Sequence, residues 1–426
     1  MEKFLLVLAI SGIALQVLLL LVALFEPPLA YRIQQRPRTT LNSDEFARVL
    51  GTVADSEPHR DTQVDVLTNG PAFYEAELAA IAQAQSHICI EAYIFQKGSI
   101  ATRFTAALAE RARAGVEVRI VLDALGSFNT WRHTFRDLIA AGGQVEWYMP
   151  FRWYNLLRIN NRTHREMIVV DGLIGFIGGA GIADHWYRDR GRHKRRWRDT
   201  MFRVRGRAVA SLQSMFAENW LESSGELLSG EKYYPVSQTE GGTAAMIINS
   251  TPSHGRGTRA RMVFQTLIAS ACHSIHITTP YFLPDRSARQ ELIRAMKDRG
   301  VELTIIVPGT HSDHLLTRRS SRRLYGDLLK HGAQIYEYEP SMIHTKSLVV
   351  DSVWSVVGST NFDSRSFGIN DEVNLAALDD TLARRLGEDF RSDLAKSRCI
   401  TYEAWKQRPV TERANELLGW ILERQQ

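Results

Sequence analysis

The stretch "HTKSLVVD" (344–351) occurs a second time, in altered form, as "HREMIVVD" (164–171). Each copy begins with a histidine, continues into a short apolar run and ends with an aspartate, and equivalent residues are 180 positions apart. Short apolar runs of this kind are typical of buried β-strands. The lysine two residues after His344 is replaced by Glu166 in the earlier copy. The chain therefore repeats one strand motif with an inverted charge.

Three further pairs of similar segments flank the two motifs, in the same order in each half. They are 73–95 with 262–282, 112–127 with 297–312, and 135–150 with 325–340. Each segment combines a helical pattern with an apolar strand, which predicts an α/β sandwich in each half. The fold class is therefore α/β, with two homologous α-β-α lobes in a pseudo-two-fold arrangement.

The N-terminus predicts a transmembrane helix. Residues 4–25 contain no charge, and 22 such residues are long enough to span a bilayer core of roughly 30 Å. A cleavable signal peptide would have an apolar region of only about 7 to 15 residues. Lys3 precedes the apolar run and Arg32, Arg36 and Arg38 follow it, so the positive-inside rule predicts a single-pass protein of the inner membrane with a cytoplasmic body.

These patterns predict five parts of the chain. They are a transmembrane anchor (1–28), a polar linker (29–64), a first lobe with the variant HxE motif (65–235), a second lobe with the HxK motif (243–410) and a C-terminal helix (411–426).

The net charge of +5 and the pI of about 9.1 favour an anionic partner, such as phospholipid, nucleic acid or a phosphorylated metabolite. The basic stretch 187–199 suits a solvated loop, lipid headgroups or nucleic acid. The aromatic stretch 147–157 suits either the packing of the lobe interface or contact with the membrane. Three dispersed cysteines give no zinc-binding pattern.

Side chains alternate along a strand, so His344 and Lys346 should share one face, as should His164 and Glu166. A histidine beside an ammonium group suits a phosphoryl group, because imidazole can act as nucleophile or acid while lysine neutralises the non-bridging oxygens. Asp171 and Asp351 are an odd number of residues from their histidines. They should lie on the other face or at the strand end, where they could orient an imidazole.

The segment "GSTN" (358–361) follows the second motif. Its small residues, including Ser359, allow close approach of the backbone, and the Asn361 side chain can bind a substrate oxygen. The equivalent "GGAG" (178–181) has Gly181 where the second copy has Asn361.

These residues resemble the phospholipase D superfamily and, within it, the bacterial cardiolipin synthases. The second copy, with "HTKSLVVD", "GSTNFDSRSF" and "NDEVN", is similar to the complete HxKx4D motif. The first copy, with "HREMIVVDG", "FIGGAGIADHW" and "WRDT", departs from the motif at Glu166 and Gly181. The resemblance covers residues 65 to about 410.

The resemblance implies two lobes that share one active site and need neither metal nor another cofactor. It also implies a phosphohistidine intermediate, with His164 the nucleophile and His344 the acid that protonates the leaving alcohol. Asp199 and Glu372 occupy matching places after the two motifs and are expected to hold the imidazoles in position.

The expected function is that of a membrane-bound phosphatidyltransferase similar to cardiolipin synthase, acting on anionic glycerophospholipids of the phosphatidylglycerol type. The sequence leaves two alternatives open. One is a phospholipase D-type phosphodiesterase that hydrolyses phospholipid or, less consistently with an anchor, nucleic acid. The other is a catalytically degenerate lipid-binding protein.

Glu166 sets a problem, because an anion beside an anionic substrate weakens binding unless it is protonated or paired. Either the first lobe has degenerated, or an arginine neutralises the carboxylate, or the carboxylate accepts a proton from the attacking alcohol. The candidate arginines are Arg162, Arg196 and Arg198.

Overall fold

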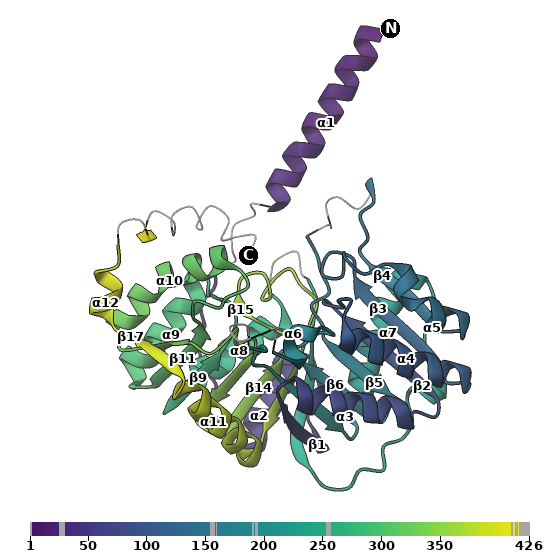
Figure 1. Ribbon diagram of the computed structural model, residues 1–426. Helices are drawn as coiled ribbons and strands as arrows, with labels where there is room; N and C mark the ends of the chain where they lie inside the picture. Colours follow the sequence, from purple (N-terminus) through teal and green to yellow (C-terminus); the bar gives the residue numbers. More distant parts are fainter. Residues whose placement is uncertain are drawn as a thin grey trace.

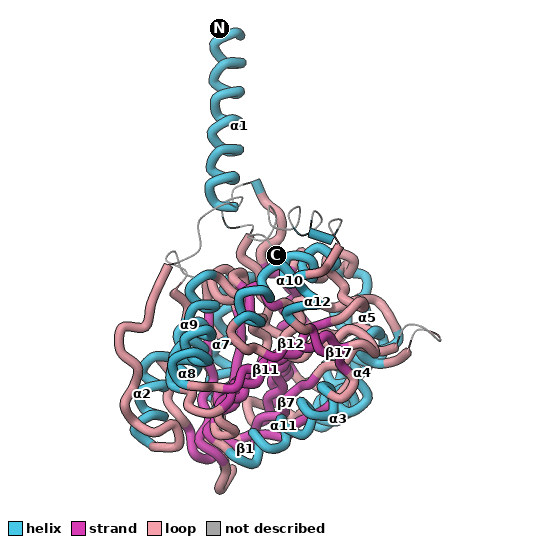
Figure 2. The backbone as a smooth tube through the Cα atoms, turned by 90° about the vertical axis from the view of Figure 1, so that its left-hand side faces the viewer, coloured by secondary structure: helices cyan, strands magenta, loops and turns pink. Residues whose placement is uncertain are grey.

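The computed structural model describes residues 2–24, 30–153, 158, 160–189, 191, 195–252, 257–409, 412–413 and 416. Within these residues, fifteen strands form one sheet in the order β17-β12-β11-β9-β13-β14-β16-β8-β1-β7-β6-β5-β2-β3-β4. Helices cover both faces of the sheet (Figure 1), and in the view turned by 90° the strands run between them (Figure 2). The predicted α/β class is confirmed.

The first lobe contains seven of the described strands. They are β1 (His59–Thr68), β2 (His87–Ala92), β3 (Glu117–Asp123), β4 (Gln144–Tyr148), β5 (Met167–Val170), β6 (Ile174–Gly178) and β7 (Thr200–Arg205). Its helices are α3 (Gly70–Gln83), α4 (Ser99–Arg113), α5 (Arg136–Ala140), α6 (Asp184–Tyr187) and α7 (Ala208–Ser224).

The second lobe repeats this order with three additional short strands. Its strands are β8 (Thr243–Ser250), β9 (Ser274–Thr278), β10 (Phe282–Leu283), β11 (Glu302–Pro308), β12 (Gln334–Tyr338), β13 (Ser347–Val350), β14 (Trp354–Gly358), β15 (Phe362–Asp363), β16 (Glu372–Leu378) and β17 (Ser397–Ile400). Its helices are α8 (Arg259–Ser270), α9 (Arg286–Arg299), α10 (Leu315–Lys330), α11 (Asp380–Leu394) and α12 (Tyr402–Lys406).

The two lobes are arranged as mirrored strand orders about the pairing of β1 with β8. From this centre outward the first lobe runs β1-β7-β6-β5-β2-β3-β4 and the second runs β8-β16-β14-β13-β9-β11-β12, with β17 added at the edge. In both lobes the outer three equivalent strands are parallel and the inner ones antiparallel. The predicted pair of homologous lobes is therefore present, and the sheet continues from one into the other.

The apolar motif strands are buried on both faces. In β5, Ile168 and Val170 belong to the core beneath α3 and α4, whereas Met167 and Val169 face a second core. That second core contains residues of α7, of α11 and of strands from both lobes. A strand covered on both faces needs a continuous apolar sequence, and here the second face also joins the lobes.

The predicted linker (29–64) is shorter than expected. Helix α2 (Asp44–Ala54) begins after Ser43, whose hydroxyl accepts the N–H of Phe46 at 3.1 Å. Phe46 and Leu50 are fully buried in the core of the second lobe, and β1 starts at His59. The five buried positions of α2 between 46 and 54 recur at helical spacing and Ser43 caps its start, so the sequence carried a signal for this helix that the prediction of a polar linker missed.

Helix α1 (Glu2–Leu24) coincides with the apolar N-terminal stretch and stands apart from the body (Figure 1). Its large apolar side chains from Phe4 to Leu19 are exposed. Over the part of the chain whose side chains are described, no helix is both long and apolar enough to cross a membrane. The helix expected over 411–426 lies almost entirely outside the described residues.

Asp171 and Asp351 end the two motif strands and brace the start of each lobe. Both residues have the left-handed backbone conformation, with φ of 53° and 52°. The Asp171 carboxylate accepts the backbone N–H groups of residues 85–87, and the Asp351 carboxylate accepts those of residues 272–274, at 2.7–2.9 Å. These are the residues that connect α3 to β2 and α8 to β9, so each aspartate fixes a turn of the fold.

We therefore expect Asp351→Ala to lower the free energy of unfolding by about 1–3 kcal/mol, because three N–H groups lose a charged acceptor. Asp351→Asn, which keeps one carbonyl acceptor, should lose less. Urea unfolding followed by circular dichroism measures the difference. A loss of activity in Asp351→Ala without any loss of stability would contradict this structural role.

Candidate active site

The start of each motif segment is hydrogen-bonded to the backbone of the opposite lobe. The N–H of His164 donates to the carbonyl oxygen of Asp371 at 2.8 Å, and the N–H of His344 donates to that of Arg198 at 2.7 Å. Isolated bridges pair Thr163 with Asp371 and Ile343 with Arg198. Each motif is therefore bonded to the segment that precedes β16 or β7 of the opposite lobe.

This exchange brings each histidine to a carboxylate of the other lobe. His164 Nδ1 lies 3.1 Å from Glu372 Oε2 and 3.1 Å from the carbonyl oxygen of Ser359. His344 Nδ1 lies 3.0 Å from Asp199 Oδ2. Both carboxylates are completely buried, so they contact the imidazoles rather than a ligand. These contacts agree with the orienting role expected for Asp199 and Glu372.

Both histidines line one cavity of about 410 Å³ between the lobes. Of the predicted residues, Glu166 and Asn361 also line it. The other lining residues are Tyr93, Ile94, Leu125, Asn160, Arg162, Gly179, Tyr281, Asp313, His314, Thr317, Asp363, Arg365, Ser366 and Asn370. The two histidines, which are 180 residues apart in the sequence, therefore meet at one cavity.

Lys346 lies against His344, as their shared strand face predicts. Its Nζ is 2.9 Å from His344 Nδ1 and 2.8 Å from the His344 carbonyl oxygen. Burial lowers the pKa of Lys346, and burial together with the Lys346 charge lowers the pKa of His344. Burial alone would raise the pKa of Asp199, but the hydrogen bond with His344 and the charge of Lys346 outweigh burial. The pKa of Asp199 is therefore lowered, which favours the ionised carboxylate.

Ser359 has a different role from the predicted one. Its hydroxyl donates to Glu372 Oε2 and accepts the N–H of Val373 at 3.0 Å, and it is completely buried. Ser359 therefore supports the carboxylate that holds His164 and does not face the cavity. Asn361 does face it, and its Oδ1 has no partner among the described residues.

Asp171 and Asp351 do not reach the site. Their carboxylates are engaged by the turns at residues 85–87 and 272–274. The predicted catalytic or orienting role of these two residues is therefore replaced by a structural one. The odd spacing from each histidine already indicated the opposite face, and the strand end carries the aspartate away from the cavity.

Glu166 has no arginine partner among the described residues. It is 4% exposed, and its Oε1 accepts the N–H of Ile94 at 3.1 Å. Burial raises its pKa well above the ordinary value, although Lys346 opposes the shift. A Cβ atom at Gly181 would lie 2.9 Å from Glu166 Oε1, so the glycine leaves room for this carboxyl. Burial therefore favours the protonated form of this carboxyl, and no ion pair with Glu166 is present among the described residues.

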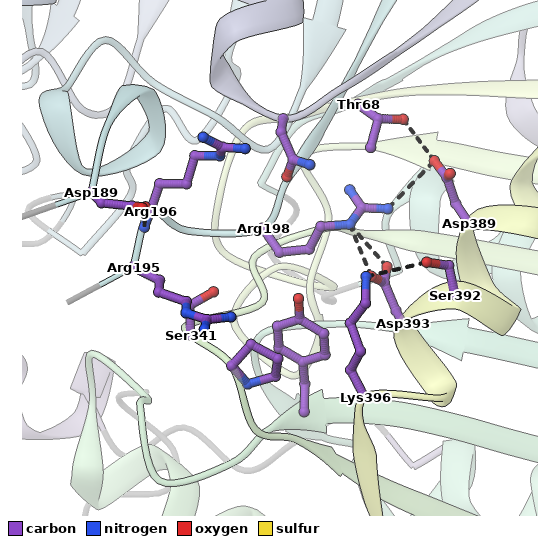
Figure 3. A pocket seen from close by; sticks show the side chains of 13 residues that line it. Thr68, Asp189, Arg195, Arg196, Arg198, Ser341, Asp389, Ser392, Asp393 and Lys396 are labelled. Atoms are coloured by element: carbon purple, nitrogen blue, oxygen red, sulfur yellow. Dashed lines mark hydrogen bonds and ion pairs between the residues drawn. The ribbon is translucent and has the colours of Figure 1, made fainter. Parts of the chain in front are cut away.

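Two of the three arginines predicted to neutralise Glu166 have a carboxylate partner elsewhere. Arg198 lines a second cavity of about 440 Å³, where its guanidinium contacts Asp393 at 2.9 Å and Asp389 at 3.4 Å (Figure 3). Arg162 lies 3.6 Å from Asp123, and the backbone N–H of Arg196 donates to Asp189. The cavity in Figure 3 contains neither histidine, and Arg198 there clamps the lobes together.

Several cavity residues were not predicted. Tyr93 lies against the His164 ring at 5.2 Å between centroids, and Tyr281 lies 6.4 Å from that of His344. Both tyrosines follow the first parallel strand of their lobe, where ligand sites of α/β sheets form, so their position was a usable signal. Arg365 lies within the quoted segment "GSTNFDSRSF", but spacing alone gave it no role.

A family model described as "Cardiolipin synthase, PLD-like domain" matches residues 78–220 and 264–394. The major cardiolipin synthase ClsA of Bacillus subtilis is 34% identical over 367 residues, which cover 85% of this chain and 75% of that protein. A cardiolipin synthase of Geobacillus kaustophilus is also 34% identical, over 85% of this chain and 72% of its own. The crystal structure of phosphatidylserine synthase from Haemophilus influenzae has a similar fold, with a TM-score of 0.66 at 14% identity over 89% of this chain and all of that chain.

We expect Glu166→Gln to keep phosphatidyl transfer within about threefold of the parent, because glutamine has the shape of a protonated glutamate. Glu166→Lys should lower it about tenfold or more, because a second buried cation would face Lys346. Transfer by purified, membrane-reconstituted variants tests both. An infrared difference spectrum should also show that Glu166→Gln removes the band of a protonated carboxyl. Higher activity in Glu166→Lys would instead indicate a degenerate first lobe.

Proposed function

The chain belongs to the cardiolipin synthase family with phospholipase D-like domains, and from this membership we propose that it transfers a phosphatidyl group between two glycerophospholipids through a phosphohistidine. The environment of His164 is the observation that carries the proposal. Its Nδ1 faces a carbonyl oxygen and a carboxylate, which are acceptors only. The ring proton is therefore held on Nδ1, and Nε2 keeps a lone pair for attack on phosphorus.

In the first step His164 Nε2 forms a bond to the donor phosphorus, and the bond from phosphorus to the leaving alcohol oxygen breaks. His344 gives its proton to that oxygen. The anionic substrate favours the protonated imidazole, which the free site disfavours through burial and Lys346. Asn361 lines the cavity and can contact a non-bridging oxygen, whereas Lys346 is not among the lining residues and adds its charge from beside His344.

In the second step an acceptor hydroxyl forms a bond to phosphorus, the bond to Nε2 breaks and His344 takes the hydroxyl proton. With a second glycerophospholipid as acceptor the product is cardiolipin, and with water it is the hydrolysis product. We propose anionic lipids of the phosphatidylglycerol type as donor and acceptor, since the relatives are named cardiolipin synthases.

We expect His164→Ala to lower transfer roughly a thousandfold or more, because it removes the nucleophile. Parent protein incubated with donor labelled in its phosphate and quenched with alkali should carry label on His164. His331→Ala, which removes an exposed histidine, is the matched control and should keep activity. Transfer that persists in His164→Ala would contradict the proposal, and hydrolysis without any transfer would favour a phosphodiesterase.

We also propose that α1 anchors the protein in the inner membrane in a single pass, with the body on the cytoplasmic side. The support is the uncharged sequence of residues 4–25 and the exposed apolar side chains of the helix. Phe151 and Trp153, in the loop after β4, are 75% and 78% exposed, which suits contact with the same membrane. The remainder of that aromatic stretch, 154–157, lies outside the described residues.

Deleting residues 1–28 should release the protein from vesicles while the lobes stay folded, because α1 stands apart from the body (Figure 1). Sedimentation with vesicles in low and high salt measures this, with circular dichroism as the folding control. Weak binding that salt removes is consistent with the basic loop. A truncated protein that stays fully bound in high salt would contradict an anchoring role.

A further inference from the structure

The first lobe has a cationic residue before its motif histidine, whereas the second lobe has one after its own. Arg162, His164 and Glu166 alternate along one extended segment, and all three line the cavity. The equivalent residues of the second lobe are Met342, His344 and Lys346. The second lobe therefore has its cation two residues after the histidine, and the first lobe has it two residues before. Arg162 is therefore placed to bind an anion in the cavity.

Arg162 is held in place but incompletely bonded. It is 2% exposed, its Nη1 donates to the carbonyl oxygen of Met149 at 3.1 Å, and the same atom lies 3.6 Å from Asp123. Its Nε and Nη2 are buried and have no hydrogen-bond partner among the described residues. Asp123 is itself engaged by the N–H groups of Leu125, Gly126 and Thr163. Buried unpaired donors are costly, so this guanidinium suits an anionic ligand.

Arg365 brings a second guanidinium to the same cavity from the second lobe. Its Nη1 and Nη2 donate to the side chain and carbonyl oxygens of Asn160 at 2.6 and 2.9 Å, which fixes its position. Burial lowers the pKa of Arg365, and the charge of Arg162 lowers it further, although Tyr93 and Asp363 oppose this. Two poorly solvated, mutually repelling cations face one cavity, and a phosphodiester between them would relieve both effects.

The donor phosphate already has the two histidines and Asn361, with Lys346 beside His344. An acceptor glycerophospholipid carries a phosphodiester of its own, whereas water and glycerol carry none. We propose that Arg162 and Arg365, one from each lobe, form the subsite for the phosphodiester of the acceptor lipid. The inference rests on the proposed phosphatidyl transfer and names the part of the site that selects a lipid rather than water.

The subsite takes no part in bond making. The acceptor hydroxyl oxygen forms the new bond to the donor phosphorus, the bond from phosphorus to His164 Nε2 breaks, and His344 takes the hydroxyl proton. The acceptor phosphodiester stays intact between the two guanidinium groups. Both arginines thus position the hydroxyl, and their loss should raise the apparent KM for the acceptor more than it lowers kcat.

The experiment compares two acceptors that present the same reacting hydroxyl. Full-length protein in vesicles of long-chain phosphatidylglycerol donor receives either labelled short-chain phosphatidylglycerol or labelled glycerol as acceptor. Incorporation of the acceptor label into cardiolipin or into long-chain phosphatidylglycerol measures each transfer. In Arg162→Gln and Arg365→Gln, kcat/KM for the anionic acceptor relative to glycerol should fall about tenfold or more, since each change removes a charged donor. Arg365→Lys should recover part of the ratio. Arg286→Gln, which alters an exposed arginine at the start of α9, should leave it unchanged.

The thermal midpoint of each variant separates loss of the subsite from loss of the fold. A parallel fall with both acceptors in a folded variant would assign the arginines to the donor phosphate and overturn the proposal. An unchanged ratio at full activity would overturn it as well. If the parent protein hydrolyses the donor but transfers to neither acceptor, the proposed phosphatidyl transfer fails instead.

Discussion

The reciprocal contact between the lobes is the constraint on which the active site depends. Each motif segment bonds to the backbone of the opposite lobe, at Asp371 for His164 and at Arg198 for His344. The residue that follows each of these contacts is the carboxylate that orients the histidine, Glu372 or Asp199. The same backbone contacts that join the lobes therefore also place the carboxylates beside the imidazoles. Neither lobe alone contains both a motif histidine and the carboxylate that orients it.

Symmetry of the backbone permits asymmetry of the side chains. Both histidines have a carboxylate partner from the opposite lobe. The second lobe adds Lys346, whereas the first has Glu166 beside Gly181, and burial raises the pKa of Glu166. A side chain at position 181 would collide with the Ile94 carbonyl oxygen and would lie 2.9 Å from Glu166 Oε1, so the glycine leaves room for both. The result is a site in which the two histidines have different neighbours: Lys346 and Asp199 beside His344, and Arg162 and Glu166 on the segment of His164.

The sequence predicted those features of the fold and the site that follow from the internal repeat and from the alternation of side chains along a strand. The 180-residue repeat indicated both lobes, and strand alternation placed His344 with Lys346 and His164 with Glu166. It could not assign Asp171 and Asp351, because their left-handed backbone directs them to turns that are remote in sequence. The sequence also could not show how the charge of Glu166 is neutralised. Whether a buried carboxyl is paired or protonated depends on which arginines other carboxylates have already engaged, as Asp389 and Asp393 engage Arg198.

The pairing of β1 with β8 and the contacts of each histidine with a carboxylate of the opposite lobe have a consequence for the chain during its synthesis. When the ribosome has completed the first lobe, His164 still awaits Glu372, more than two hundred codons downstream. The nascent first lobe thus lacks the carboxylate that orients His164. Over part of this interval β1 presents an unpaired edge, since β8 has not yet emerged. Both histidines can have their carboxylates only after β16, which begins at Glu372, has been synthesised.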